Sequence, residues 1–219
     1  MLREFEKRLI SSVILILVTF LVILEGKIFF NIFLFIAFLI SSYEWLKLTK
    51  RIDIKILGIL FLFSSFYTAF YFRDQNLEGF VLIILICVST DIGGYIFGNL
   101  FKGPKLSKIS PNKTQSGMLG SYALSLVVSS IFVLQYSNDI YIKQNLIEND
   151  LKFVILIFLI SSVSQVGDLI ISYFKRSSKI KNTGNIIPGH GGLLDRIDGM
   201  IFVFPFVYLI TLFPILIKL

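Results

Sequence analysis

The sequence predicts an all-α integral membrane protein with about seven transmembrane helices, in a range of six to eight. Apolar side chains make up 55% of its 219 residues, with 23 phenylalanines. The mean hydropathy of +0.82 lies outside the range of ordinary soluble domains. The apolar residues are also grouped into runs of the length that a membrane-spanning helix needs, about 20 residues. Lys and Arg gather in the connections between these runs.

Seven apolar runs are the candidate spans. The first is short, but Glu25, Gly26 and Lys27 follow it where a signal peptide would have a small-residue cleavage site, so we interpret it as a retained span. The single cysteine, Cys87, lies within an apolar run, which excludes a disulfide framework. We expect helices at roughly 9–24, 28–46, 56–72, 80–98, 117–136, 151–174 and 199–217.

The distribution of Lys and Arg predicts how the chain is oriented. Cytoplasmic connections of membrane proteins retain positive charge. If the N-terminus is cytoplasmic, the cytoplasmic segments 1–8, 47–55, 99–116 and 175–198 hold 16 of the 21 Lys and Arg residues. We therefore expect the N-terminus inside and the C-terminus outside. This asymmetry accounts for the net charge of +7 without nucleic acid as a partner, and basic residues beside a membrane also attract anionic lipid headgroups.

Two aspartates lie within the predicted spans. Asp91 comes late in the fourth span and Asp168 late in the sixth, so both would lie in the cytoplasmic half of the membrane. A carboxylate at that depth is unfavourable unless it is paired, hydrated or metal-bound, which makes each a candidate functional residue. The alternative is an ion pair that locks helix packing. Gly93, Gly94 and Gly98 beside Asp91 would let a helix or a ligand approach the backbone closely.

The loop after the fourth span is basic and contains no acid. Pro104 and Pro111 interrupt helix in it. Ser110, Lys113 and Thr114 lie just before the fifth span, where a helix N-terminus favours anions, and together they could hold a polyphosphate. The loop contains no Walker motif. The alternative is a solvated basic loop that only sets topology.

The segment from Ser172 to Asp198 combines bases with acids between two apolar runs. It holds five cationic side chains, two aspartates, the only histidine and four glycines. Phosphoryl and nucleotidyl transfer require neutralisation of charge on the reacting phosphate, commonly by a carboxylate-held metal. Asp195 and Asp198 are three residues apart and could share a helix face, and Asp168 precedes them on the sixth span. Oxygen ligands of this kind suit Mg²⁺, whereas one histidine and one cysteine argue against zinc.

The same segment resembles the signature of the phosphatidate cytidylyltransferase (CDP-diacylglycerol synthase) family. The matching positions are Ser172, Lys175, Arg176, Lys181, Gly184, Pro188, His190, Gly191, Gly192, Asp195, Arg196 and Asp198. A second, earlier block is similar to the same family, at Asp91, Gly93, Tyr95, Gly98, Ser110, Pro111, Lys113, Thr114 and Gly117. The resemblance runs from about residue 80 to the end. We therefore divide the chain into N-terminal membrane helices, 1–79, and a catalytic membrane region, 80–219.

Three positions depart from the family pattern. Asn182 replaces an aspartate, Ser116 replaces a glutamate and Asn99 replaces a frequent arginine. Asparagine keeps a hydrogen bond but not a charge, which argues against a metal or proton role at position 182. Within the matching positions, His190 could orient its glycine-rich turn rather than bind substrate, and Asp198 could cap a helix.

The resemblance implies transfer of the cytidylyl group of CTP to phosphatidate, which gives CDP-diacylglycerol and pyrophosphate in phospholipid biosynthesis. It implies Mg²⁺ held by Asp168, Asp195 and Asp91, with a second cation left open. The implied catalytic residues are Asp168, Asp195, Lys175, Arg176, Arg196 and Lys181. The implied substrate-binding residues are Asp91, Ser110, Lys113, Thr114, Ser172, His190 and Asp198.

The implied setting is a bacterial inner membrane with the active site facing the cytoplasm. The expected partners are CTP, phosphatidate and membrane lipid, and a homodimer is left open. Two alternatives remain. Another CTP-dependent lipid enzyme, such as a polyprenol or phytol kinase, would transfer a γ-phosphoryl group to an alcohol. An ion or organic-anion transporter would use the acids within the spans as a translocation path, but the internal repeats and interrupted helices of such proteins are not evident.

Overall fold

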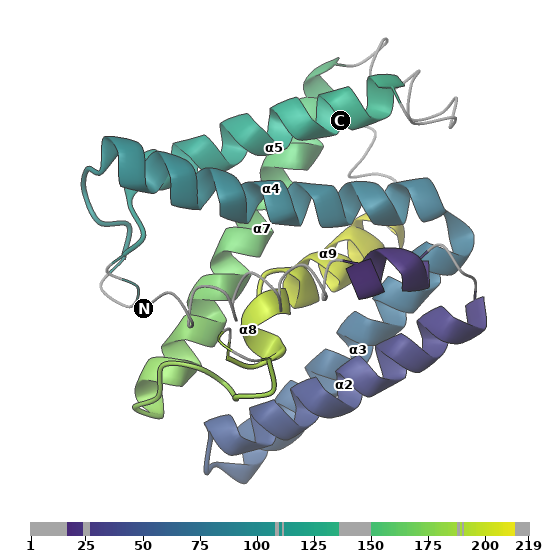
Figure 1. Cartoon of the computed structure of the whole chain (residues 1–219), viewed down its shortest axis with the longest axis vertical. Helices are drawn as coiled ribbons and strands as arrows, with labels where there is room; N and C mark the ends of the chain where they lie inside the picture. The colour runs from purple at the N-terminus through teal and green to yellow at the C-terminus, as the bar shows by residue number, and fades with distance from the viewer. Residues whose placement is uncertain are drawn as a thin grey trace. The chain divides into compact units, whose positions relative to one another are not determined.

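The computed structural model describes residues 17–23, 27–107, 110, 112–135, 150–187, 189 and 191–212, most of which are helical (Figure 1). Its named helices are α2 (Lys27–Leu48), α3 (Ile52–Gln75), α4 (Leu77–Phe101), α5 (Gln115–Gln135), α7 (Asp150–Ser177), α8 (Leu194–Ile197) and α9 (Met200–Leu212). Among these described helices, α2, α3, α4, α5 and α7 are long and apolar enough to cross a membrane, and α9 is a shorter apolar helix. The predicted all-α membrane class is therefore confirmed. Most of the first predicted span and the end of the last lie outside the described residues.

The first basic connection is shorter than the sequence predicts. We expected a loop over 47–55, but α2 continues to Leu48 and α3 begins at Ile52. Lys47 lies in the last turn of α2 and Asp53 in the first turn of α3, where each charge complements the helix dipole. Arg51 pairs with Asp53 across 2.5 Å. Charged residues thus extend both helices beyond their apolar runs.

A single residue, Asn76, joins α3 to α4. Its side chain caps α4 by accepting a hydrogen bond from the Gly79 N–H at 2.8 Å. An N-cap of this type satisfies one of the backbone donors left open at a helix start. The cap explains why two spans can follow one another with so short a connection.

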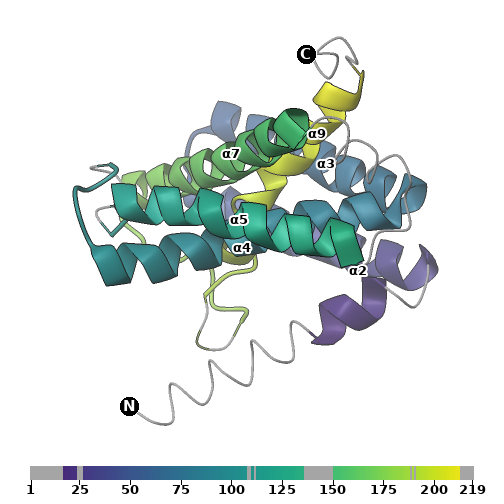
Figure 2. The ribbon, with the colours of Figure 1, turned by 90° about the horizontal axis from the view of Figure 1, so that it is seen from above.

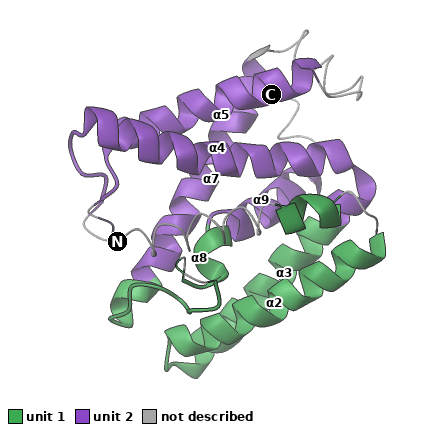
Figure 3. Cartoon of the chain, in the orientation of Figure 1, with its two compact units in different colours: residues 1–70, 174–198 green, residues 71–173, 199–219 purple. Residues whose placement is uncertain are grey.

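The chain divides into two compact units (Figure 3). Unit 1 contains residues 1–70 and 174–198, and unit 2 contains residues 71–173 and 199–219. Helices α3 and α7 each contribute residues to both units. We expected a division at residue 79 because the motifs lie only after it. The two compact units are defined by contacts and not by motifs, so the division at residue 79 stays a prediction.

Within unit 1, α2 packs against the first part of α3 through aromatic side chains. The Phe38 ring meets the rings of Phe63 and Phe66 edge to face, with centroids 6.2 and 5.8 Å apart. Trp45 lies against Gly58, where a Cβ atom would fall 1.8 Å from the indole nitrogen. Glycine at position 58 therefore makes room for the tryptophan ring.

Within unit 2, α4 and α5 lie side by side, as Figures 1 and 2 show. Glycines line their contact. A Cβ atom on Gly93 would lie 2.5 Å from the Gly120 carbonyl oxygen, and one on Gly117 would lie 2.7 Å from the Gly94 carbonyl oxygen. Small residues allow this close backbone approach between helices in lipid. Gly93 and Gly94 therefore take part in helix packing, and Gly94 also lines a pocket of unit 2.

Candidate active site

The loop after α4 turns back so that its end meets the start of α5. Lys102 and Gly103 have positive φ values of 51° and 105°, and Gly103 tolerates this conformation without a Cβ penalty. Two backbone hydrogen bonds hold the two sides of this loop together. The Leu106 N–H donates to the Lys113 carbonyl at 2.8 Å, and the Gln115 N–H donates to the Pro104 carbonyl at 3.0 Å. This backbone pairing fixes Lys113 at the entrance to α5.

Thr114 is the N-terminal cap of α5. Its Oγ1 atom accepts a hydrogen bond from the Gly117 N–H at 3.1 Å and lies 3.0 Å from the Ser116 Oγ. The Ser116 hydroxyl donates to the Lys102 carbonyl. Ser116, one of the departures from the family pattern, therefore fastens the loop to the start of α5 in this chain.

A pocket of about 320 Å³ opens within unit 2 beside this loop. It brings together five of the predicted site residues, four from the earlier motif block and Asp168 from the span that leads into the later block. Asn112 and Gln165 also line it and were not singled out in the sequence, whereas Tyr95, another lining residue, is one of the family matches. Gln165 could have been found from its spacing, because it precedes Asp168 by three residues on one helix and so shares its face. The predicted residues in the pocket are Asp91, Ser110, Lys113, Thr114 and Asp168.

An ion pair inside this pocket joins the earlier motif block to the span that leads into the later one. The Lys113 Nζ lies 2.5 Å from the Asp168 Oδ2, and the two side chains are 27% and 24% exposed. The Ser172 hydroxyl donates to the Asp168 Oδ1 at 3.2 Å. The predicted residues Lys113, Asp168 and Ser172 are thus in contact, and Asp168 is oriented from two sides.

In unit 1, Asp195 lies in the first turn of α8 and accepts hydrogen bonds from the glycine-rich loop that precedes it. Its Oδ1 accepts a hydrogen bond from the Lys175 Nζ at 2.8 Å. Its Oδ2 accepts from the Thr183 N–H at 2.8 Å and the Gly192 N–H at 3.0 Å. The Asp198 carboxylate lies 4.0 Å from the same Lys175 ammonium. The predicted residues Lys175, Asp195 and Asp198 therefore form one cluster.

The pKa of Asp195 reflects a competition between burial and hydrogen bonding. Burial acts to raise this pKa, but the hydrogen bonds from Lys175, Thr183 and Gly192, with the Lys175 charge, outweigh it. The pKa of the carboxyl group lies below its ordinary value, because donors to the charged form favour ionisation. Asp195 is therefore a carboxylate at neutral pH, held in place by a cation and two backbone donors.

The other predicted residues of this loop differ in their surroundings. Arg176, Lys181 and Arg196 are exposed, as side chains that bind a phosphate from solvent need to be. Asp198 is buried, with 8% of its surface exposed. His190 lies outside the described residues, so its predicted role stays a prediction.

A residue that the sequence did not indicate holds the same loop from α2. Glu44 is buried and accepts hydrogen bonds from the backbone N–H groups of Leu193 and Leu194 at 2.9 and 2.8 Å. The Thr183 hydroxyl also donates to it, at 2.9 Å. A single glutamate near the end of an apolar run gave no motif. Its burial is seen only in the structure.

The donor set in the unit 2 pocket suits a metal that arrives with a nucleotide. In the described part of the chain, no three His, Cys, Asp or Glu side chains lie close enough together to hold a metal ion by themselves. The pocket does hold two carboxylates, Asp91 and Asp168, with the Gln165 amide and nearby hydroxyls. Mg²⁺ is commonly bound by one or two carboxylates plus substrate phosphates. These residues fit that mode of binding.

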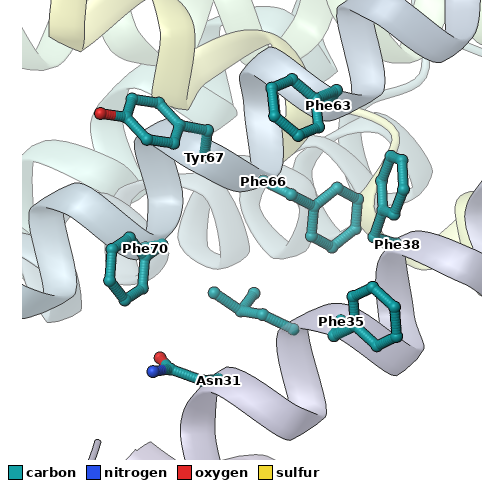
Figure 4. Close-up of a pocket in the computed structure, with 8 residues that line it drawn as sticks. Asn31, Phe35, Phe38, Phe63, Phe66, Tyr67 and Phe70 are labelled. Atoms are coloured by element: carbon teal, nitrogen blue, oxygen red, sulfur yellow. The ribbon is translucent and has the colours of Figure 1, made fainter.

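An apolar pocket of about 330 Å³ in unit 1 contrasts with this site (Figure 4). It lies between α2 and α3, and its lining includes neither a carboxylate nor a cationic side chain. No reactive group is available there, so we assign it no chemistry. The lining residues are Asn31, Leu34, Phe35, Phe38, Phe63, Phe66, Tyr67 and Phe70.

Comparison with known proteins shows which family the chain resembles. A model of the cytidylyltransferase family matches residues 55–213. The phosphatidate cytidylyltransferases of Rickettsia typhi and Rickettsia prowazekii are 31% and 32% identical over 211 residues, which cover 94% of this chain and 91% of each relative. The phosphatidate cytidylyltransferase of Bacillus subtilis is 39% identical over 164 residues, 72% of this chain and 57% of that protein.

The helices and the two polar clusters define a helical integral membrane protein with acidic and basic side chains suited to phosphate and metal. The matched region includes both motif blocks. The chain belongs to the cytidylyltransferase family, which confirms the resemblance found in the sequence.

Proposed function

We propose that this chain is a phosphatidate cytidylyltransferase, which converts CTP and phosphatidate into CDP-diacylglycerol and pyrophosphate. Its family and the names of its relatives support this proposal. The observation that carries it is the unit 2 pocket. There Lys113 of the first motif block pairs with Asp168, which leads into the second, and Asp91 lines the same space.

In the proposed reaction, a phosphate oxygen of phosphatidate attacks the α-phosphorus of CTP. The bond between that phosphorus and the oxygen bridging to the β-phosphorus breaks, and pyrophosphate leaves with the bonding electron pair. The attacking oxygen is already anionic, so no side chain has to remove a proton from it. Positioning and charge neutralisation are therefore the main tasks of the protein.

The unit 2 pocket would bind the triphosphate of CTP. Lys113 would exchange its contact with Asp168 for a phosphate oxygen, and Ser110 and Thr114 would donate hydrogen bonds beside it. That exchange would free the Asp168 carboxylate, which with Asp91 would hold Mg²⁺. When bound, Mg²⁺ would neutralise negative charge on the phosphates.

The unit 1 cluster would handle the remaining phosphate charge. The exposed side chains of Arg176, Lys181 and Arg196 are the proposed phosphate ligands, and Lys175 is held beside them by Asp195. Asp195 remains a predicted Mg²⁺ ligand as well. Among the described residues its Oδ1 accepts one hydrogen bond, from Lys175, and a carboxylate oxygen has two lone pairs for such contacts.

We also propose seven spans, a cytoplasmic N-terminus and an active site that faces the cytoplasm of a bacterial inner membrane. The concentration of Lys and Arg in alternate connections supports this orientation. Cysteine labelling from either side of sealed vesicles tests it. A homodimer stays a prediction, which light scattering of the detergent-solubilised protein tests.

The activity is tested with purified protein in phosphatidate-containing micelles. Incubation with α-labelled CTP and Mg²⁺ should give a labelled lipid that retains cytidine, and Asp168→Asn should abolish it. A lipid labelled only from γ-labelled CTP would instead indicate a kinase. Absence of any labelled lipid with the unmutated protein would contradict the proposed function.

A further inference from the structure

The proposed reaction gives no role to Glu44, a buried charged residue of unit 1. Glu44, on α2, is 1% exposed. A buried carboxylate is unfavourable unless hydrogen bonds or an opposite charge compensate it. Within the described ranges, Glu44 has no Lys or Arg partner, and three hydrogen bonds compensate it instead. All three donors belong to the loop that carries Asp195.

Two glycines of the motif fit closely against this carboxylate. A Cβ atom on Gly184 would lie 2.8 Å from the Glu44 Oε1, and one on Gly192 would lie 2.5 Å from its Oε2. A Cβ atom on Gly192 would also come within 2.1 Å of the Thr183 Oγ1. Any larger residue at these positions would force the Glu44 or Thr183 side chain, or the loop, to shift. The close contact with Glu44 of α2 therefore explains why positions 184 and 192 are occupied by glycine.

Glu44 and Asp195 hold the same turn. Thr183 bridges them, since its hydroxyl donates to Glu44 while its backbone N–H donates to Asp195. The successive N–H groups of Gly192, Leu193 and Leu194 are divided between the two carboxylates, the first going to Asp195 and the next two to Glu44. A shift of the Glu44 carboxylate would therefore move the backbone groups that orient Asp195 and, through it, Lys175.

We propose that Glu44 is a positioning residue for the reaction, which holds the 183–195 loop in the geometry that presents Lys175 and Asp195 to phosphate. This inference rests on the proposed function. Glu44 itself does not contact substrate in this proposal. Glu44 determines where the loop lies. Its replacement should therefore change the rate of the reaction without changing how CTP binds in the unit 2 pocket.

Glu44→Gln is the informative variant because it keeps the size of the side chain. The amide oxygen can still accept hydrogen bonds, but in either orientation the amide nitrogen would face the backbone N–H of Leu193 or Leu194, and an amide nitrogen cannot accept from an N–H. A misplacement of about 1 Å can lower a rate about 10²-fold. We expect a loss of that order in kcat, with KM for CTP unchanged. Glu44→Asp, which keeps the charge on a shorter side chain, should recover part of the loss.

Ser41→Ala is the matched control. Ser41 lies one turn earlier on α2, is equally buried, and its hydroxyl has no hydrogen-bond partner among the described residues. It should leave kcat and thermal unfolding unchanged. The proposal is overturned if Glu44→Gln keeps the kcat of the unmutated protein, or if its loss equals the loss of folded protein measured by size-exclusion chromatography.

A second readout does not depend on activity. Lys179 and Lys181 are exposed in the loop, so trypsin cleavage at these residues reports how firmly the loop is held. Cleavage should be faster in Glu44→Gln than in the unmutated protein and unchanged in Ser41→Ala. If the unmutated protein gives no labelled lipid, the proposed function fails, yet faster cleavage would still show that Glu44 holds the loop. Equal cleavage rates would overturn the positioning role.

Discussion

Replacing Lys113 by methionine removes the cation of the unit 2 pocket but keeps an unbranched side chain. The ion pair with Asp168 is about a quarter exposed on each side. Exposed pairs contribute about 0.2–1 kcal/mol, while breaking a buried pair costs about 3–5 kcal/mol. For this partly screened pair we expect the free energy of unfolding to fall by about 1–2 kcal/mol.

The same substitution should weaken the use of CTP by more than the loss of stability explains. A hydrogen bond to a charged group contributes about 1.5–3 kcal/mol, and about 1.4 kcal/mol corresponds to a factor of ten in rate. We therefore expect kcat/KM for CTP to fall about 10- to 100-fold in Lys113→Met. The matched control is Lys50→Met, which removes an exposed lysine outside the pocket and should change neither quantity.

Two assays separate a phosphate ligand from a packing contact. The first measures formation of labelled lipid at varied CTP, and the second measures how far CTP with Mg²⁺ raises the unfolding temperature, since a ligand that binds the folded state stabilises it. If Lys113 only locks the helices, Lys113→Met will be destabilised but protected by CTP as fully as the unmutated protein. That result, with an unchanged kcat/KM, would refute the proposed role of Lys113.

Three further predictions concern the loops. Gly192→Ala places a Cβ atom against Thr183 and Glu44. Such overpacking typically lowers the free energy of unfolding by about 1–3 kcal/mol, which thermal unfolding in detergent measures. An unchanged unfolding midpoint would show that the loop can relax. Asp195→Asn should be less stable than the unmutated protein above the unfolded-state pKa of about 3.9. Because the folded-state pKa is lower, that difference should shrink as the pH falls through it, and unfolding scans that show a pH-independent difference would contradict this. Thr114→Ala should cost about 1 kcal/mol through loss of the α5 cap, whereas Thr114→Ser should preserve stability in the same scan.

The sequence predicted much of the unit 2 pocket because the membrane restricts the possible arrangements. Each apolar run has to cross as a helix, since lipid offers no partners for backbone polar groups. Asp91 and Asp168 lie late in two such runs and Lys113 lies just before a third, so topology alone would place all three in the same half of the membrane. Their detailed contacts could not be predicted, because the ion pair depends on how the loop after α4 turns back.

Glu44 shows why the rest of the site could not be predicted. Its partners are mainly backbone N–H groups, which every residue except proline possesses and which leave no mark in the sequence. The glycines that accommodate it are recognisable as a motif, but the sequence does not say what they accommodate. The helix ends were misplaced for a related reason, since charged residues such as Lys47 and Asp53 continue a helix where hydropathy alone would end it.

The close contact between α4 and α5 also bears on how the protein is made. These helices are adjacent in the chain, and their glycine-lined contact needs no other helix to form. Helices that pack through small residues can associate once both are inserted in lipid. We therefore expect α4 and α5 to pair as a hairpin during synthesis, before α7 leaves the ribosome. Lys113 would then lack its Asp168 partner until α7 is inserted, and the unit 2 pocket would form only at that step, before residues 199–219 complete the unit.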